Sequence, residues 1–133
     1  MEGTQLRWGI IGAGNVAHDF ATALRTLPNS EHKLTAIASR SLQRAQEFAA
    51  LHNASKAYGS YKSMLEEGEV DIVYVATVNN THSSVVTMAL DHDKHVLCEK
   101  PLAVNTREAE DLIRFAKDKQ LFLMEVIILK TLG

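Results

Sequence analysis

The chain has 133 residues, 46% of them hydrophobic and 23% charged, and a formal net charge of −2 at pH 7. These values fit one globular domain, and the weakly negative charge gives no support for binding to nucleic acid or to an anionic membrane. No apolar run approaches the roughly 20 residues that span a bilayer, so we expect no membrane partner.

The cysteine content and the first residues bear on the compartment of the protein. Cys98 is the only cysteine, so no intramolecular disulfide can form, which suits a reducing environment. The first residues lack the basic and apolar regions of a secretory signal. We therefore expect a cytoplasmic location, and no residue pattern predicts a metal site.

Short apolar runs alternate with amphipathic stretches along the whole chain. The runs predict strands at residues 6–11, 33–39, 56–58, 70–77, 94–98 and 121–124. The stretches predict helices at residues 15–26, 41–52, 60–67, 80–91 and 105–119, the last of which opens with a capping-box pattern. Because strands that alternate with helices indicate βαβ units, we predict an α/β fold: a doubly wound, mostly parallel six-stranded sheet with helices on both faces.

A glycine-rich segment joins the first predicted strand to the first predicted helix. Its sequence at residues 12–17, Gly-Ala-Gly-Asn-Val-Ala, fits the G-x-G-x-x-G/A pattern of dinucleotide-binding turns. Gly12 permits a tight turn and Gly14 lets a pyrophosphate approach the backbone, and we expect the N–H groups around Asn15 and Val16 to face the phosphates. The alternative is a glycine-rich turn without a ligand. The motif predicts a Rossmann-type domain, which we assign to residues 1–125.

The end of the second predicted strand indicates which nicotinamide cofactor binds. An NAD site places an acidic residue about 20 residues after the glycines, where it bonds the ribose 2′-hydroxyl. Here the strand ends in Ser39 and Arg40 without a carboxylate, and Glu31 precedes the strand, at its wrong end. Ser39 offers a hydroxyl and Arg40 a cation for a 2′-phosphate, or a guanidinium that stacks on adenine. We predict a preference for NADPH over NADH; the alternative is that Arg40 is only a solvated loop residue.

Polar residues follow the fourth predicted strand, which is expected to flank the first. Thr77 and Asn79 are candidates to bond the ribose or the carboxamide of the cofactor. Alternatively, Asn79 or Asn80 only caps the next helix. His82, in the first turn of that helix, is equally consistent with a structural histidine and with a substrate contact.

The tripeptide Glu99-Lys100-Pro101 directly follows the fifth predicted strand. Ligands of open α/β sheets bind at the carboxyl ends of strands, which makes Lys100 a candidate catalytic residue. Its amine could donate a hydrogen bond to a substrate oxygen or carry a proton, and the alternative is a surface ion pair with Glu99. The sequence leaves open whether the bond before Pro101 is cis or trans.

Taken together, these motifs resemble those of one enzyme family. They match the Gfo/Idh/MocA oxidoreductases in order and spacing, through residues 9–17, Ser39-Arg40, Ala76-Thr77, His82 and Glu99-Lys100-Pro101. The resemblance implies NADP-dependent oxidation of a hydroxyl-bearing carbon on a trans-dihydrodiol or on an aldose such as D-xylose. It implies that Lys100 lies beside the nicotinamide and assists substrate binding and proton transfer. It also implies that Gly12 and Gly14 contact the phosphates and that Ser39 and Arg40 contact the 2′-phosphate; we expect Glu99 to contact the cofactor as well.

Two features depart from the family pattern. Val78 stands where members usually have proline, and the apolar stretch at residues 126–133 does not resemble the usual crossover to a second domain. In the family, that domain completes the substrate pocket, supplies an acid/base and forms a dimer. We therefore expect a parent enzyme that is a homodimer through this domain, and we expect the domain to be absent here.

The sequence supports three functional hypotheses: the cofactor-binding part of an oxidoreductase, a non-catalytic NADPH-binding module or truncated isoform, and, ranked last, an interaction domain with an unused glycine loop. Hydride transfer needs substrate within about 3–3.5 Å of the nicotinamide and away from water, which half a pocket does poorly. We expect the chain to bind NADPH weakly, to turn over little, and to self-associate through its apolar stretch.

Overall fold

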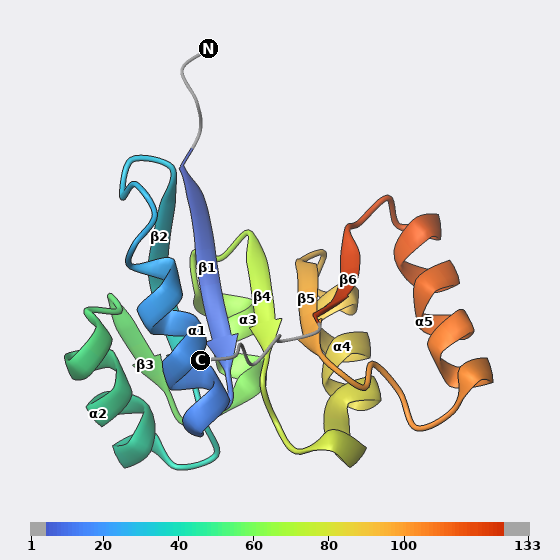
Figure 1. Cartoon of the computed structure of the whole chain (residues 1–133), viewed down its shortest axis with the longest axis horizontal. Coiled ribbons are helices and arrows are strands. Elements are labelled where there is room, and N and C mark those ends of the chain that lie inside the picture. The colour runs from blue at the N-terminus through green and yellow to red at the C-terminus, as the bar shows by residue number, and fades with distance from the viewer. Residues whose placement is uncertain (1–4, 127–133) are drawn as a thin grey trace, which may run out of the picture.

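A six-stranded parallel sheet forms the centre of the structure (Figure 1). The computed structural model describes residues 5–126, except the side chain of Asn79. The strands lie in the order β3-β2-β1-β4-β5-β6, and each runs parallel to its neighbours. Their bounds are β1 Leu6–Ile11, β2 His32–Ala38, β3 Lys56–Tyr58, β4 Ile72–Val75, β5 His95–Glu99 and β6 Leu123–Val126. The predicted α/β fold is confirmed, and the sheet is wholly parallel.

In the described part of the chain, five α-helices cover the two faces of the sheet. One face carries α1 and α2, and the other carries α3, α4 and α5. None of these helices is long and apolar enough to cross a membrane. Their bounds, with the short 3₁₀ helix η1 that precedes α4, are α1 Asn15–Leu24, α2 Leu42–His52, α3 Tyr61–Glu67, η1 Asn79–Thr81, α4 His82–Asp91 and α5 Thr106–Asp118.

Side-chain caps explain where three of the helices begin. The hydroxyl oxygens of Ser41 and Ser60 each accept a bond from the backbone N–H three residues later, at 3.2 and 3.3 Å. The Asn105 side chain accepts from the Glu108 N–H at 2.8 Å, as the sequence pattern predicts. Each cap satisfies one N–H group that a helix start leaves unpaired. By contrast, α1 follows Gly14 and has no side-chain cap.

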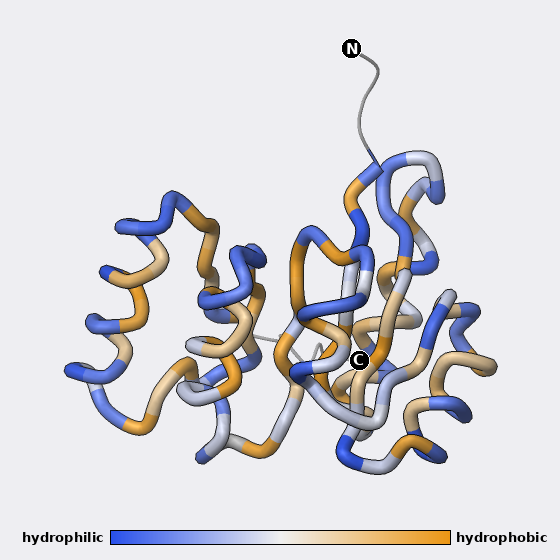
Figure 2. The backbone as a smooth tube through the Cα atoms, turned by 180° about the vertical axis from the view of Figure 1, so that it is seen from behind, coloured by the Kyte–Doolittle hydropathy of each residue, from blue (hydrophilic) through white to orange (hydrophobic). Residues whose placement is uncertain are grey.

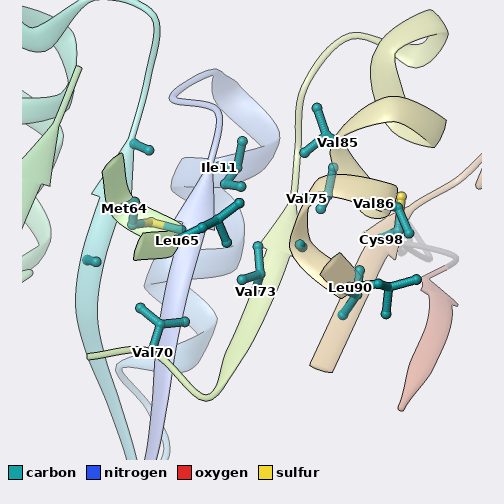
Figure 3. Close-up of a cluster of buried hydrophobic side chains, with 14 of the residues drawn as sticks. Ile11, Met64, Leu65, Val70, Val73, Val75, Val85, Val86, Leu90 and Cys98 are labelled. Carbon is teal, nitrogen blue, oxygen red and sulfur yellow. The ribbon is translucent and has the colours of Figure 1, made fainter. Parts of the chain in front are cut away.

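Apolar side chains fill the space on both sides of the sheet and fix the helices against it. On one side, Val73 of β4 packs with Val86 and Leu90 of α4, in the cluster that Figure 3 shows. On the other side, Phe48 of α2 and Tyr74 of β4 belong to a second buried cluster. The hydrophilic residues of α5 lie on the side away from the sheet (Figure 2). Burying one such large apolar side chain contributes about 1.5–3 kcal/mol, so the two layers hold the strand ends in fixed positions.

The strand order creates a crevice beside β1. The chain passes from β1 to β2 on one side and returns to β4 on the other, so the direction of winding reverses there. In open α/β sheets, this reversal leaves room for a ligand at the carboxyl ends of the strands. The glycine loop at residues 12–14 lies at this end of β1, between β2 and β4.

Two predicted strands, β4 and β6, differ from those observed by two residues, and β2 and β5 are displaced by one residue. β6 runs two residues later than predicted, because Gln120 adopts a left-handed conformation (φ 59°) and the Leu121 N–H still bonds to Ala116 O at the end of the helix. β4 is shorter than predicted at both ends. Val126, which the sequence places in the apolar stretch, is the last residue of β6. The rest of that stretch, residues 127–133, lies outside the described residues.

Candidate cofactor site

Gly12 makes the tight turn that the glycine motif predicts. Its φ is +107°, and a Cβ atom there would lie 2.7 Å from the backbone oxygen of Ala76. The Gly12 N–H donates to Ala38 O at 2.9 Å, which ties the turn to the end of β2. The fold itself therefore requires glycine at this position, since any side chain meets the backbone after β4.

Gly14 differs from Gly12, because nothing in the protein lies within 4 Å of where its Cβ atom would be. Its φ of −88° is open to other residues, so the fold does not require glycine here. The start of α1 has no side-chain cap, and its first residues, Asn15 and Val16, line the same open space as Gly14. The turn thus leaves room against the backbone and offers donors there, which is the arrangement that holds a pyrophosphate.

These residues line a cleft of about 520 Å³ at the carboxyl ends of β1, β2 and β4. We call it the switch-point cleft. Of the predicted site residues, it brings together Gly12, Gly14, Asn15, Val16, Ser39, Arg40 and Thr77; its other lining residues are Ala13, Ser41, Arg44, Tyr61, Ala76 and Val78. The volume is in the range of small-molecule sites, so the cleft can hold a substantial part of a dinucleotide.

The β2 side of the cleft carries two arginines and no lining carboxylate among the described residues. Ser39 is 6% exposed, and its hydroxyl oxygen accepts from the Ser41 N–H at 3.3 Å, whereas Arg40 is exposed. Arg44 lies in the first turn of α2, and its guanidinium lies 3.4 Å from the Ala13 backbone oxygen. Two guanidinium groups and a hydroxyl at one strand end can bind a doubly charged phosphate.

Sequence reasoning missed Arg44 and Tyr61, which also line the cleft. For Arg44 a signal was present, since Ser41 is the helix cap and a residue three positions later lies in the first helical turn, near the strand end. Tyr61 comes from α3 and reaches the cleft only through the folding of the chain after β3.

The β4 side of the cleft is held together by His82. The ring is 1% exposed, and its two nitrogens lie 2.6 Å from Pro101 O and 2.8 Å from Thr77 O. It thereby joins the end of β4 to the loop after β5, so of the two roles considered for His82 the structure supports the structural one. The Thr77 hydroxyl accepts from Thr81 at 2.8 Å. The side chain of Asn79 lies outside the described set.

The end of β5 places Glu99 and Lys100 outside the residues that line the cleft. The Glu99 carboxylate accepts a hydrogen bond from the Tyr74 hydroxyl at 2.5 Å, and within the described residues Lys100 forms no ion pair, so the surface pair considered for Glu99 and Lys100 is not formed. Lys100 is exposed, is joined to Pro101 by a cis peptide bond, and donates its backbone N–H to Val126 O at 3.2 Å. Burial raises the pKa of the neighbouring Cys98 thiol to about 12, so this cysteine is not a reactive thiolate at neutral pH.

A family comparison agrees with this geometry. Residues 6–126 match the GFO_IDH_MocA oxidoreductase family, whose members have an NAD-binding Rossmann fold. The chain belongs to the Gfo/Idh/MocA oxidoreductases. It is an NAD(P)-binding domain of that family, and the resemblance inferred from the motifs is confirmed.

Curated relatives of the chain carry the name trans-1,2-dihydrobenzene-1,2-diol dehydrogenase. The protein from Danio rerio is 48% identical over 122 residues, and the protein from Sus scrofa is 46% identical over the same length. Both matches cover 92% of this chain but 36% of the relative. The chain therefore spans little more than a third of the length of these relatives.

Two solved structures superimpose closely on the domain. The 3-ketoreductase KijD10 from Actinomadura kijaniata, solved in complex with NADP, is 36% identical with a TM-score of 0.85; the match covers 91% of this chain and 38% of that one. An NAD binding oxidoreductase from Klebsiella pneumoniae is 30% identical with a TM-score of 0.85, over 93% of this chain and 35% of that one.

Proposed function

We propose that this chain is the cofactor-binding part of an NADP-dependent oxidoreductase that oxidises a hydroxyl-bearing carbon of a trans-dihydrodiol or of an aldose such as D-xylose. One observation carries the proposal: the switch-point cleft combines the open backbone at Gly14 with Arg40 and Arg44 at the end of β2. The names of the curated relatives support the dihydrodiol, and the solved relative with bound NADP supports the cofactor.

The preference for NADP follows from charge at the end of β2. The ribose 2′-phosphate carries nearly two negative charges, and Arg40 and Arg44 provide two cations on the same side of the cleft, with the Ser39 hydroxyl beside them. A hydrogen bond to a charged group contributes about 1.5–3 kcal/mol, so each arginine should favour NADPH over NADH by roughly tenfold or more. A carboxylate at this strand end, which would favour NADH, is not found among the residues that line the cleft.

The remaining contacts extend from the pyrophosphate to the nicotinamide. In this proposal the N–H groups around Gly14, Asn15 and Val16 bind the pyrophosphate, while Thr77 and Asn79 bind the nicotinamide nucleoside, along with Glu99. The nicotinamide accepts a hydride from the substrate carbon when it is bound. This places the reacting carbon near the carboxyl ends of β4 and β5, where the chain carries Lys100.

We assign Lys100 the role of catalytic residue at this end of the sheet. Its side-chain nitrogen can hydrogen-bond the substrate hydroxyl oxygen and hold it in place. As the carbonyl forms, the amine in its neutral form would take the hydroxyl proton and release it to water. Two observations support this role: Lys100 has no ion-pair partner among the described residues, and it lies one strand beyond Thr77.

A non-catalytic NADPH-binding module is the second candidate. It is favoured by the exposure of Lys100, because hydride transfer requires a site from which water is excluded. The dihydrodiol or sugar, the acid/base partner and the homodimer of the parent enzyme all remain proposals, since the chain spans 36% of its relatives.

Titration of the chain with NADPH and NADH, followed by an activity assay, tests the proposal and separates its two forms. We expect NADPH to bind, with enhanced fluorescence, and no measurable NADPH formation from NADP with D-xylose or trans-1,2-dihydrobenzene-1,2-diol. Turnover by the chain alone would overturn the expectation that catalysis needs residues beyond it. Failure to bind either nucleotide would overturn the proposed function itself.

A further inference from the structure

Tyr74 is a buried tyrosine at the centre of the sheet whose hydroxyl reaches one acidic group. It lies on β4, it is 0% exposed, and its ring stacks on Phe20 of α1, with centroids 3.8 Å apart and planes 9° from parallel. Its hydroxyl donates to Oε2 of Glu99, on the neighbouring strand, at 2.5 Å. A buried phenol needs a hydrogen-bond partner, and Glu99 provides it.

The bond to Glu99 is of the charge-assisted kind. Donor and acceptor oxygens 2.5–2.7 Å apart are typical of a hydroxyl that donates to a carboxylate. Burial, and then the hydrogen bond to Glu99, raise the pKa of Tyr74 far above its ordinary value, so the phenol stays protonated and keeps donating. The carboxylate of Glu99 therefore has one oxygen held in a fixed direction.

This bond changes what Glu99 can do for Lys100 and for the cofactor. The two residues are neighbours in the chain, yet within the described residues the carboxylate bonds Tyr74 and forms no ion pair with the lysine. The second carboxylate oxygen, Oε1, accepts no hydrogen bond from the described residues. Glu99 lies at the carboxyl end of β5, one strand beyond the cleft wall at Thr77, which is the end where the proposed nicotinamide lies.

We propose that Tyr74 is a positioning residue that acts through Glu99. It directs Oε1 of Glu99 toward a donor of the nicotinamide nucleoside, either its carboxamide N–H or a ribose hydroxyl, and it keeps the carboxylate from pairing with Lys100. The stack on Phe20 holds the phenol in place from the side of α1, the helix that begins at the proposed pyrophosphate site. This inference rests on the proposed function, and it adds a residue that touches neither cofactor nor substrate.

Tyr74→Phe tests the inference, because it removes the hydroxyl and keeps the stacked ring. The two probes are NADPH and adenosine 2′,5′-bisphosphate, which has the adenosine and 2′-phosphate but no nicotinamide. We expect the variant to bind NADPH about threefold to tenfold more weakly, the effect of one oriented hydrogen bond, and to bind adenosine 2′,5′-bisphosphate with unchanged affinity. Tyr58→Phe is the matched control, since Tyr58 is also buried but lies on β3, away from β5, and neither affinity should change.

A double-mutant cycle asks whether Tyr74 acts through Glu99. Glu99→Gln should weaken NADPH binding by as much as Tyr74→Phe does. The double variant should lose little more NADPH affinity than either single variant. Additive losses would contradict the inference. So would equal weakening of both nucleotides in Tyr74→Phe, which indicates a merely structural role, or no weakening of NADPH at all.

A cofactor-independent signal distinguishes this inference from the proposed function. A short hydroxyl–carboxylate bond gives a downfield proton resonance in the NMR spectrum of the chain, which should vanish in Tyr74→Phe and in Glu99→Gln and persist in Tyr58→Phe. Absence of that resonance from the wild-type chain would overturn the positioning role. If instead the resonance is present but the wild-type chain binds neither nucleotide, the proposed function fails and the positioning role fails with it.

Discussion

At the proposed phosphate end of the site, Gly12, Gly14, Arg40 and Arg44 line one cleft, whereas at the proposed nicotinamide end Lys100 is exposed and lies outside it. The phosphate end is built by one βαβ unit and the start of the next helix, which are neighbours in the chain. The nicotinamide end gathers residues from β4, β5 and the loops after them. The proposed cofactor site is therefore nearly complete within the described residues, while the surroundings of the proposed catalytic lysine are not.

This difference makes binding and turnover separable properties of the chain. Residues of the phosphate end should control affinity for the cofactor without regard to substrate. Residues of the nicotinamide end should have small effects on affinity and should show their full effect only in a complete enzyme. Substitutions at the two ends, and between them, test how far this separation holds.

The largest effect is expected from substitution of Gly12 and Gly14. These variants test whether the fold requires glycine at one position and the proposed ligand requires it at the other. Gly12→Ala forces a Cβ atom against Ala76 O at a positive φ and should destabilise the chain by roughly 2–3 kcal/mol. Gly14→Ala meets no atom within 4 Å, so it should cost less than about 1 kcal/mol as an uncapped helix start. Urea unfolding measures both values.

The same pair of variants separates the ligand from the fold. Gly14→Ala should nevertheless weaken the binding of NADPH by about tenfold or more, because the methyl group occupies the space proposed for the pyrophosphate. If Gly14→Ala binds NADPH as the wild-type chain does, the cleft does not hold the phosphates in the way proposed.

The next largest effect is expected from substitution of Arg40 and Arg44, which should impair only the phosphate end of the proposed site. Replacing Arg40 or Arg44 by alanine should weaken NADPH by about tenfold or more, through loss of a charge-assisted hydrogen bond, and should change NADH binding far less. Fluorescence titration of both nucleotides measures this. Lys62→Ala, on an exposed part of α3 that does not line the cleft, is the control. Equal losses of affinity for NADPH and for NADH would show that the arginines do not recognise the 2′-phosphate.

A smaller effect is expected at the connection between the two ends. In His82→Gln, a single amide group replaces a ring whose nitrogens contact both Thr77 O and Pro101 O, so one part-buried carbonyl group loses its partner. An unpaired buried group costs about 1–3 kcal/mol, and the free energy of unfolding should fall by the lower part of that range. An unchanged free energy of unfolding would mean that the ring does not hold the β4 and β5 ends together.

The smallest effect is expected at the opposite ends of the central strands β1 and β4, where Asp71 accepts from the Arg7 backbone at 2.8 Å and from its guanidinium at 2.9 Å. These bonds lower the pKa of Asp71 below its ordinary value of 3.8. Since the pKa in the folded state lies below that in the unfolded state, the pair stabilises the fold above about pH 4, and this contribution is lost as the pH falls through the folded pKa.

Asp71→Asn tests that pH dependence. The variant should be less stable than the wild-type chain by about 1 kcal/mol at pH 7, and the difference should shrink below pH 4. Asp111→Asn, in the exposed pair with Arg114, should show almost no difference at either pH. A difference for Asp71→Asn that stays constant from pH 7 to pH 2 would contradict the assignment.

Much of this architecture follows from local sequence pattern. The alternation of strands and helices predicts the parallel sheet, and the turn at Gly12 needs only its own neighbours, so both were predictable. The position of β6 was not, because it depends on how α5 ends at Gln120. The bond between Tyr74 and Glu99 was also out of reach, since it joins residues 25 positions apart and depends on strand register.

The ratio of NADPH to NADH affinity in the wild-type chain tests the central claim most directly. Both dissociation constants can be measured on the same preparation by calorimetry, with no substrate and no assumption about catalysis. Two arginines beside the proposed 2′-phosphate predict that NADPH binds at least about tenfold more tightly than NADH. Equal binding, or tighter binding of NADH, would contradict the account.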